Sequence, residues 1–388
     1  MAGLKAAVGR AYAVDGRDAS TQAIHQGFAD LGSREVAAAF LFASHDYDIN
    51  EVLSGATAQL GNTPIFGFST SGEFAEDGSN RRSVVAALLS GEGIEAQAEW
   101  IPDFTSNMQV AVERMTRELH LTSQENATLL VAADGLSAEG EDLCKRLPFG
   151  RYTLAGCLAG GDLRLGRTFQ IGGAQAGTGG LAAALLHGVL RVGVGTAHGW
   201  RPVGAYFRVT TSQGPWVRTL DHVPAAEMYS QLFGFKPREW GFPPLNTLVR
   251  LYPLGIENGQ KPLKVRAPLR VETDGSLRMS TPVDENCVAQ LLVGSRESCM
   301  EAAHQATERA LEKLEGAKPV LALVFTDVSW QMLLEGQLSS EIHAVQEILG
   351  EDVPIAGGYT FGQIARSPES DLPEFLNQHI EVVIFGAR

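Results

Sequence analysis

The chain carries one segment pattern three times, and this repetition limits its possible folds more than any other feature. Each copy has a short apolar run, a helical stretch, a second apolar run that enters a glycine-rich loop, and a third apolar run. The three glycine-rich segments are residues 64–74, 153–163 and 354–364. Repetition at this scale is typical of duplicated supersecondary units, so the sequence indicates a duplicated architecture.

The apolar runs predict strands. They are rich in Val, Leu, Ile and Ala and are shorter than most helices, which favours strands buried on both faces. The flanking runs are residues 37–44, 83–91, 127–135, 180–188, 320–327 and 380–386. Helical patterns precede the copies at residues 21–31, 107–119 and 298–314. We therefore predict an α/β (mixed α+β) fold, in which repeated helix–strand–helix–strand–loop–strand modules form mixed sheets flanked by helices, in two interlocked domains.

The glycines of the three loops align without gaps. The aligned pairs are Gly67 and Gly72, Gly156 and Gly161, and Gly357 and Gly362. The residue after the second glycine is Glu73, Asp162 or Gln363.

Between the second and third copies the pattern changes to short strands and turns. Asp274-Gly275 stands between two such strands and is a strong signal for a β-hairpin. We place a domain boundary here, with one domain at residues 1–204 holding two modules. The second domain, residues 205–388, would hold the β-rich insert and the third module.

The charge of the chain limits its partners. Its 388 residues carry a net charge of −14, and basic runs are almost absent. Nucleic acids and anionic membrane surfaces need clustered Lys and Arg, so neither is expected as a partner. No apolar run reaches the roughly 20 residues that span a bilayer, and no signal peptide is evident at the N-terminus. We expect a cytoplasmic protein without membrane insertion.

Metal-binding and redox motifs are not evident either. The four cysteines, Cys144, Cys157, Cys287 and Cys299, show no CxxC spacing. No HExxH or HxxxH pair occurs. We therefore expect no metal site.

Several short motifs carry a family resemblance. Residues 66–73 read FGFSTSGE, residues 154–169 hold a second glycine motif with Asp162 and Arg167, and residues 199–204 read GWRPVG. Further along are YPLG at 252–255, DGSL at 274–277, PIAGGYTFGQ at 354–363 and FLNQ at 375–378. Together and in this order, the motifs resemble the FIST family, with its FIST N and FIST C domains. Two features depart from the family pattern: Gln363 stands where the family usually has an acid, and the second motif carries the less polar Cys157-Leu158-Ala159.

The resemblance implies a sensory protein. Such a protein binds a small ligand, with an amino acid as the ligand class considered, and relays a signal to a separate effector such as a histidine kinase or a cyclase. Some family members are haem-binding nitric oxide sensors. A haem-based nitric oxide sensor is therefore the alternative function, and haem is the alternative to the expectation of no cofactor.

The glycine loops are the candidate ligand site. Ligands of open α/β sheets bind beyond the carboxyl ends of strands, where these loops lie. Acidic side chains there can hold an ammonium group and arginines can hold a carboxylate, which suits a small zwitterion. The candidate residues are Ser69, Thr70, Ser71, Glu73, Asp162, Arg164, Arg167, Tyr359, Thr360 and Gln363. The competing interpretation is that the glycines shape tight turns and the hydroxyls cap them.

An enzymatic function is not expected. The segment 67–72 misses the nucleophile elbow because its second glycine comes one residue late, and residues 358–362 have the spacing but carry Thr360. Neither segment has a recognisable His–Asp pair to support it. A hydrolase or transferase that uses Cys157, Ser69 or Thr360 is the second alternative.

Overall fold

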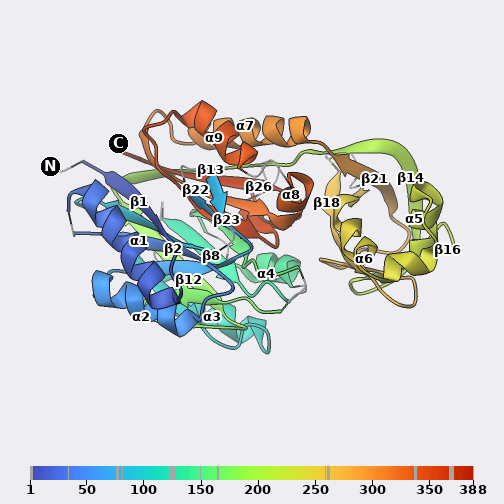
Figure 1. The fold of residues 1–388 in the computed structure, drawn as a ribbon, viewed down its shortest axis with the longest axis horizontal. Helices are drawn as coiled ribbons and strands as arrows, with labels where there is room; N and C mark the ends of the chain where they lie inside the picture. The colour runs from blue at the N-terminus through green and yellow to red at the C-terminus, as the bar shows by residue number, and fades with distance from the viewer. Residues whose placement is uncertain are drawn as a thin grey trace. The chain divides into compact units, whose positions relative to one another are not determined.

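The protein forms two compact units built from mixed sheets and helices (Figure 1). The computed structural model describes residues 3–33, 35–75, 78–80, 82–121, 127–137, 139–148, 150–163, 166–257, 259, 263–335, 339–366 and 371–387. Unit 1 comprises Met1–Ala197, Met300–Phe375 and His379–Arg388, and unit 2 comprises His198–Cys299 and Leu376–Gln378. The predicted mixed fold class is confirmed.

Unit 1 contains the three predicted modules, and all three have the same topology. The first consists of β1 (Lys5–Ala11), α1 (Gly16–Leu31), β2 (Ala38–Ser44), α2 (Ile49–Leu60), β3 (Ile65–Thr70) and β6 (Val84–Ser90). The second consists of β7 (Ile94–Ile101), α3 (Met108–Glu118), β8 (Thr128–Ala133), α4 (Gly140–Arg146), β9 (Thr153–Leu158) and β12 (Leu181–Gly188). The third consists of β13 (Leu190–Ala197), α7 (Arg296–Glu312), β22 (Lys318–Asp327), α8 (Val328–Leu333), α9 (Ser340–Leu349), β23 (Ile355–Thr360) and β26 (Ile380–Ala387).

The strand order is the same in the three sheets. It is β1-β6-β2-β3 in the first, β7-β12-β8-β9 in the second and β13-β26-β22-β23 in the third. In each sheet the last two strands are parallel, as β2 and β3 are, and the other neighbours are antiparallel. The duplicated architecture predicted from the glycine alignment is therefore present in space.

Each module also gives a hairpin to the sheet of another module. The hairpin β4 (Glu73–Ala75) and β5 (Gly78–Asn80) leaves the first module and extends the third sheet at β23. The hairpin β10 (Gln170–Gly172) and β11 (Gln175–Gly177) leaves the second module and extends the first sheet at β3. The strands β24 (Gln363–Arg366) and β25 (Pro373–Leu376) follow β23 and extend the second sheet at β9. The three exchanges form a closed cycle.

The strands are buried on both faces, as their continuous apolar runs predict. Alternate residues of β2 and β3 point to opposite faces. One set, with Leu41 and Ile65, packs beneath α1 and α2. The other set includes Phe42 and Phe68, which contact each other and Phe325 of the third sheet at ring-centroid distances of 5.2 to 5.9 Å. Aromatic packing thus joins the first and third sheets.

Unit 2 is a mostly antiparallel β structure. Its eight-stranded sheet has the order β18-β17-β21-β14-β15-β20-β19, and β16 pairs with β15. The strands are β14 (Trp200–Gln213), β15 (Trp216–Leu220), β16 (Val223–Pro224), β17 (Leu254–Ile256), β18 (Lys264–Arg266), β19 (Pro268–Val271), β20 (Leu277–Met279) and β21 (Val288–Gly294). The helices are α5 (Ala225–Phe233), η2 (Pro237–Gly241), α6 (Leu245–Leu248) and η3 (Val249–Leu251). The hairpin predicted at Asp274-Gly275 is confirmed, since β19 and β20 pair on either side of it.

The compact units do not follow the sequence division at residues 1–204 and 205–388. The third module begins with β13, before that division, and continues with α7, after most of unit 2. Unit 2 is therefore inserted between the first strand and the first helix of the third module. Among the helices formed by the described residues, none is long and apolar enough to cross a membrane.

Candidate functional site

The glycine loops of the three modules meet where the edge hairpins are exchanged. Each loop is bonded through its backbone to both of the others. The connecting hydrogen bonds run from Ser71 N to Tyr359 O (3.0 Å), from Gly160 N to Ser69 O (2.8 Å) and from Phe361 N to Leu158 O (2.9 Å). We call this place the three-loop junction.

Glycine is needed here because the backbones approach too closely for a side chain. A Cβ on Gly160 would lie 2.1 Å from Tyr359 O and 2.9 Å from Ser71 N. The first aligned glycine of each loop also has no room for a side chain, because its Cβ would lie about 2 Å from a carbonyl oxygen of the parallel partner strand. The distances are 2.3 Å for Gly67 to Leu41 O, 2.1 Å for Gly156 to Val131 O and 1.9 Å for Gly357 to Val324 O. The glycine pattern therefore has a packing cause.

The first and third modules each have the same side-chain contact at the junction, between a threonine and the residue three positions later. We call this contact the clasp. In the first, Thr70 Oγ1 donates to Glu73 Oε1 at 2.5 Å. In the third, Gln363 Nε2 donates to Thr360 Oγ1 at 3.0 Å. Glu73 and Gln363 occupy the same position after the second aligned glycine, so the amide reproduces the contact of the acid with the hydrogen bond reversed. The departure at Gln363 keeps the clasp.

The carboxyl group of Glu73 is fully buried and has a perturbed pKa. Its Oε2 accepts hydrogen bonds from Ser83 N at 2.9 Å and Ser83 Oγ at 2.8 Å. Burial raises the pKa of Glu73 to about 7, and the hydrogen bonds from Thr70 and Ser83 act in the opposite direction. The group therefore exchanges its proton near neutral pH.

The remaining hydroxyls of the junction are also used internally. Ser69 Oγ donates to Gly160 O at 2.7 Å and accepts from Phe169 N at 2.9 Å. Ser71 Oγ donates to Gly161 O, and the Tyr359 hydroxyl donates to Glu341 on α9. The junction thus brings together seven of the ten predicted residues, with their side chains buried. These are Ser69, Thr70, Ser71, Glu73, Tyr359, Thr360 and Gln363.

The second module lacks the clasp. Ala159 stands at the threonine position, and Asp162 is partly exposed and accepts from Gly166 N at 2.9 Å. Arg167 is exposed, and its guanidinium donates from Nε to His45 O and from Nη2 to Tyr47 O, both at 3.0 Å. Arg164 lies outside the described residues.

These residues form a polar rim around one side of the junction. His45 Nδ1 donates to Thr70 O at 3.1 Å, and the neighbouring Ser71 is 9% exposed. Ser71 contacts Gly161, the residue before Asp162, and a Cβ on Gly161 would lie 2.5 Å from Arg167 O. The Arg167 guanidinium donates to His45 O, so His45, Ser71, Asp162 and Arg167 lie close to one another through backbone contacts, and we call these four residues the polar rim. His45 was not among the predicted site residues, although it directly follows the strand predicted at 37–44.

Cys157 lies on β9 in a fully buried position. Burial and the neighbouring carboxyl of Glu381 raise the pKa of its thiol well above the usual value. Glu381 on β26 accepts from Gly156 N at 3.2 Å, and burial raises its pKa well above the usual range. The acid in an otherwise apolar strand was not singled out from the sequence. Within the described residues, no three or more His, Cys, Asp or Glu side chains gather as a metal site would require.

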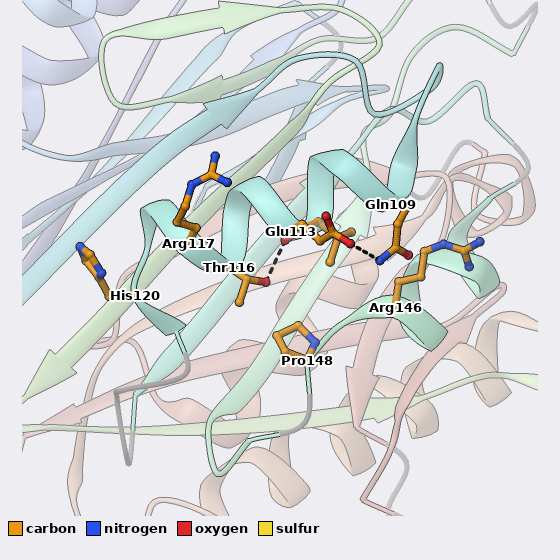
Figure 2. Close-up of a pocket in the computed structure, with 8 residues that line it drawn as sticks. Gln109, Glu113, Thr116, Arg117, His120, Arg146 and Pro148 are labelled. Atoms are coloured by element: carbon orange, nitrogen blue, oxygen red, sulfur yellow. Dashed lines mark hydrogen bonds between the residues drawn. The ribbon is translucent and has the colours of Figure 1, made fainter.

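A cavity of about 620 Å³ lies between α3 and the C-terminal end of α4 (Figure 2). It is lined by Gln109, Val112, Glu113, Thr116, Arg117, His120, Arg146 and Pro148, none of which belongs to the predicted site. Gln109 Nε2 donates to Glu113 Oε1 at 2.6 Å, and the side chains of Arg117 and Arg146 extend in different directions in Figure 2. The charged groups of this cavity therefore do not converge on one ligand position.

Comparison with known proteins gives a family match over most of the chain. Residues 37–223 match the FIST N domain and residues 225–366 match the FIST C domain. No curated protein shows significant similarity to the sequence. Among solved structures, a cyanuric acid hydrolase from A. caulinodans is 11% identical, with a TM-score of 0.26 over 48% of this chain and 71% of that chain.

Two further structures match over their whole length. A second cyanuric acid hydrolase structure is 8% identical with a TM-score of 0.38, and a chorismatase is 11% identical with a TM-score of 0.32. Each match covers 100% of both chains. At these values the similarity carries no conclusion about function.

The packing at the junction predicts the effect of Gly160→Ala. The new methyl group would overlap backbone atoms of two other loops, and overpacking of this kind costs about 1–3 kcal/mol. We expect the melting temperature to fall by several degrees in a calorimetric scan. Gly241→Ala is the matched control, because no heavy atom lies within 4 Å of the Cβ position there. An unchanged melting temperature for Gly160→Ala would show that the loops are not tightly packed.

The buried carboxyl of Glu73 predicts a pH-dependent stability. Its pKa is about 7 in the folded protein and 4.5 for an unperturbed Glu side chain, so the folded state binds more protons between these values. The free energy of unfolding should therefore fall as pH rises from about 4.5 to about 7, by up to about 3 kcal/mol from this group. Glu73→Gln should keep the clasp, as Gln363 does, and lose this dependence. Urea unfolding at pH 5 and pH 8 measures the difference between the two proteins.

Gln363→Glu is the reciprocal test. It should introduce a stability loss toward alkaline pH at the equivalent position in the third module. If Glu73→Gln leaves the pH dependence unchanged, Glu73 does not hold a proton in the folded state.

Proposed function

Because this chain belongs to the FIST family of sensory, ligand-binding domains, we propose that it binds a small polar ligand and relays the bound state to a separate protein. The ligand class we propose is an amino acid. The effector is a signalling protein such as a histidine kinase or a cyclase, and the protein acts in the cytoplasm. No cofactor takes part in this proposal.

The polar rim is the ligand site in this proposal, and the position of Asp162 and Arg167 carries it. These two opposite charges flank one loop beside the three-loop junction and face solvent at least in part. A carboxylate binds an ammonium group and a guanidinium binds a carboxylate through charge-assisted hydrogen bonds. An amino acid supplies both groups a few ångströms apart. His45 and Ser71 lie next to them, with the His45 Nδ1 bonded to Thr70 O and the Ser71 hydroxyl bonded to Gly161 O.

The interior of the junction is a poorer site than its rim. Thr70, Glu73 and Gln363 are buried and bonded to partners within the protein. A ligand that entered there would have to replace these contacts, and an unpaired buried polar group costs about 1–3 kcal/mol. The hydroxyl-capping interpretation therefore fits the junction, and the ligand-binding interpretation fits the rim.

The chemistry of the possible nucleophiles supports a binding protein. Ser69 Oγ donates to a carbonyl oxygen, Gly160 O, which cannot accept a proton as a general base does. Thr360 Oγ1 is engaged by Gln363 and by Thr326 O at 3.4 Å. Cys157 is buried with a raised pKa, so its reactive thiolate form is disfavoured. The haem-based alternative stays a prediction, which a titration with haemin and a search for a Soret shift would test.

Isothermal titration with the common amino acids tests the proposal. We expect one class to bind, and we expect Asp162→Asn and Arg167→Gln each to weaken binding about 10- to 100-fold, because a charge-assisted hydrogen bond contributes about 1.5–3 kcal/mol. Arg114→Gln is the control, since Arg114 is a partly exposed arginine on α3 paired with Glu118 at 2.8 Å. The Arg114→Gln variant should bind the amino acid with the same affinity as the unchanged protein.

The methyl ester of the bound amino acid separates a direct contact from a structural effect. The ester should bind weakly to the unchanged protein, and Arg167→Gln should weaken it little further, because both changes remove the same ion pair. Independent, additive losses would place Arg167 outside the ligand contact. Failure of every amino acid to bind would remove this ligand class from the proposal.

A further inference from the structure

The two clasps of the three-loop junction have opposite hydrogen-bond directions. Thr70 Oγ1 donates to Glu73 Oε1 at 2.5 Å, whereas Thr360 Oγ1 accepts from Gln363 Nε2 at 3.0 Å. A threonine hydroxyl can donate or accept, but a glutamate side chain can donate only when it carries a proton. The first clasp thus has the direction that an ionised acid requires, and the third has the direction that a protonated acid would require.

The contacts of Glu73 determine which of its oxygens can take up a proton. Oε2 accepts from Ser83 N at 2.9 Å and from Ser83 Oγ at 2.8 Å, and a backbone N–H can only donate. Oε1 accepts from the Thr70 hydroxyl, which can reverse its role. The proton of a neutral Glu73 therefore lies on Oε1 and is donated to Thr70 Oγ1.

The third module also shows where the threonine hydroxyl then donates. While Thr360 Oγ1 accepts from the amide of the clasp, it donates to Thr326 O at 3.4 Å. The register of β2 against β3 places Ala43 at the position that Thr326 has in β22. Ala43 O is therefore the corresponding acceptor for Thr70 in the first module.

Thr70 also connects the first clasp to the polar rim. Its carbonyl oxygen accepts from His45 Nδ1 at 3.1 Å and from His45 N at 3.4 Å, and His45 O accepts from Arg167 Nε at 3.0 Å. The Thr70 side chain has little room to turn, because a Cβ on Gly358 would lie 2.5 Å from its Cγ2. A turn of this side chain toward another acceptor therefore acts on its own backbone and on His45.

The charged groups on the elements around Glu73 are held by other contacts. β2, β3, β5 and β6 contain no acid, base or histidine. Arg10 on β1 and Arg82 before β6 donate to backbone carbonyls, and Glu341 on α9 accepts from Tyr359 on β23. Of the described residues, no charged side chain acts on the pKa of Glu73, which burial raises and the hydrogen bonds lower. The protonation of this group is therefore governed by its own clasp.

We propose that Thr70 and Glu73 form a proton-operated switch for the polar rim. In the ionised state the Thr70 hydroxyl donates to Glu73, and a proton taken from solvent reverses this bond, so that Thr70 donates to Ala43 O instead. Thr70 thereby shifts His45 and changes the affinity of the rim for its ligand. This last step rests on the proposed function, and the reversal of the clasp does not.

Backbone amide resonances, followed by NMR from pH 5 to pH 9, test the switch without a ligand. The Ser83 amide, which donates to Glu73, should shift with a midpoint near pH 7, and the His45 amide should respond at the same midpoint. Glu73→Gln fixes the neutral direction at every pH, so the Ser83 shift should vanish. The titration of the His45 ring is present in both proteins, and the difference between them measures the effect of the switch.

Variants of Thr70 separate the hydroxyl from the nearby charge. In Thr70→Val the Ser83 amide should still titrate, with a higher midpoint because a donor to the carboxylate is lost, while the His45 amide loses its response. Thr70→Ser keeps the hydroxyl and should keep the response. Thr360→Val is the matched control, because the same change beside Gln363, which does not titrate, should leave both signals as in the unchanged protein.

Isothermal titration at pH 6 and pH 8 tests the step that concerns the ligand. For the amino acid that binds, we expect the change in affinity between the two pH values to differ about fivefold or more between the unchanged protein and Glu73→Gln. Coupling of this kind is reciprocal, so the bound amino acid should move the midpoint of the Ser83 titration.

The outcomes keep the two proposals separate. A Ser83 amide that does not titrate, or a His45 response that survives Thr70→Val, would overturn the switch. If the amides behave as expected and no amino acid binds, the ligand proposal fails and the switch stands. If an amino acid binds with the same pH dependence in the unchanged protein and in Glu73→Gln, the switch does not control the rim.

Discussion

The exchange of edge hairpins between the three sheets is the constraint on which unit 1 depends. Each module ends in an edge strand, β3, β9 or β23, whose unpaired N–H and C=O groups would otherwise be exposed. A hairpin from another module covers each edge, so no single module completes its own sheet. The segment that leads into each hairpin has to cross from one sheet to the next, and the three crossings meet at the three-loop junction. The close approach of their backbones then requires glycine, because a Cβ on Gly160 would lie 2.1 Å from Tyr359 O.

The module that departs from the shared pattern is the one that contributes both charges of the polar rim. The first and third modules fix their crossings with a buried clasp, Thr70 to Glu73 and Thr360 to Gln363. In the second module Ala159 cannot form this hydrogen bond, and Asp162 lies at the surface instead. The three modules thus contain three equivalent positions, and two of these hold the buried clasp. At the third position Asp162 is partly exposed, and this is where the functional proposal assigns the ligand.

Local patterns in the sequence predicted the strands and the modules but not their partners. The run at 37–44 forms β2 at Ala38–Ser44, because strands buried on both faces must be continuously apolar. The exchange of hairpins could not be predicted, since pairing between segments as distant as β4 and β23 leaves no local signal. The insertion of unit 2 after β13 could not be predicted either, because β13 pairs with the distant strand β26. For the polar residues, the sequence predicted one ligand site of ten residues. Seven of them gather at the junction, but the sequence did not predict that their hydrogen-bonding groups face one another. Glu381 was overlooked because a single acid within a strand has the same local pattern whether it is buried or exposed.

The chain path joins the proposed ligand site to the segments that lead into unit 2. β13 runs directly into unit 2, and α7 returns from it. These two elements pack closely in unit 1, where a Cβ on Gly195 would lie 1.9 Å from Ala306 O and Arg309 Nη1 donates to Thr196 O at 2.6 Å. β26 lies beside β13, and its Glu381 accepts from Gly156 N on β9, the strand that leads into the loop of Asp162. A ligand that shifts this loop therefore acts on a strand that is hydrogen-bonded, through one buried carboxyl group, to the sheet from which unit 2 departs. In the functional proposal, this carboxyl group is the contact through which a shift of the loop would reach the sheet of β13.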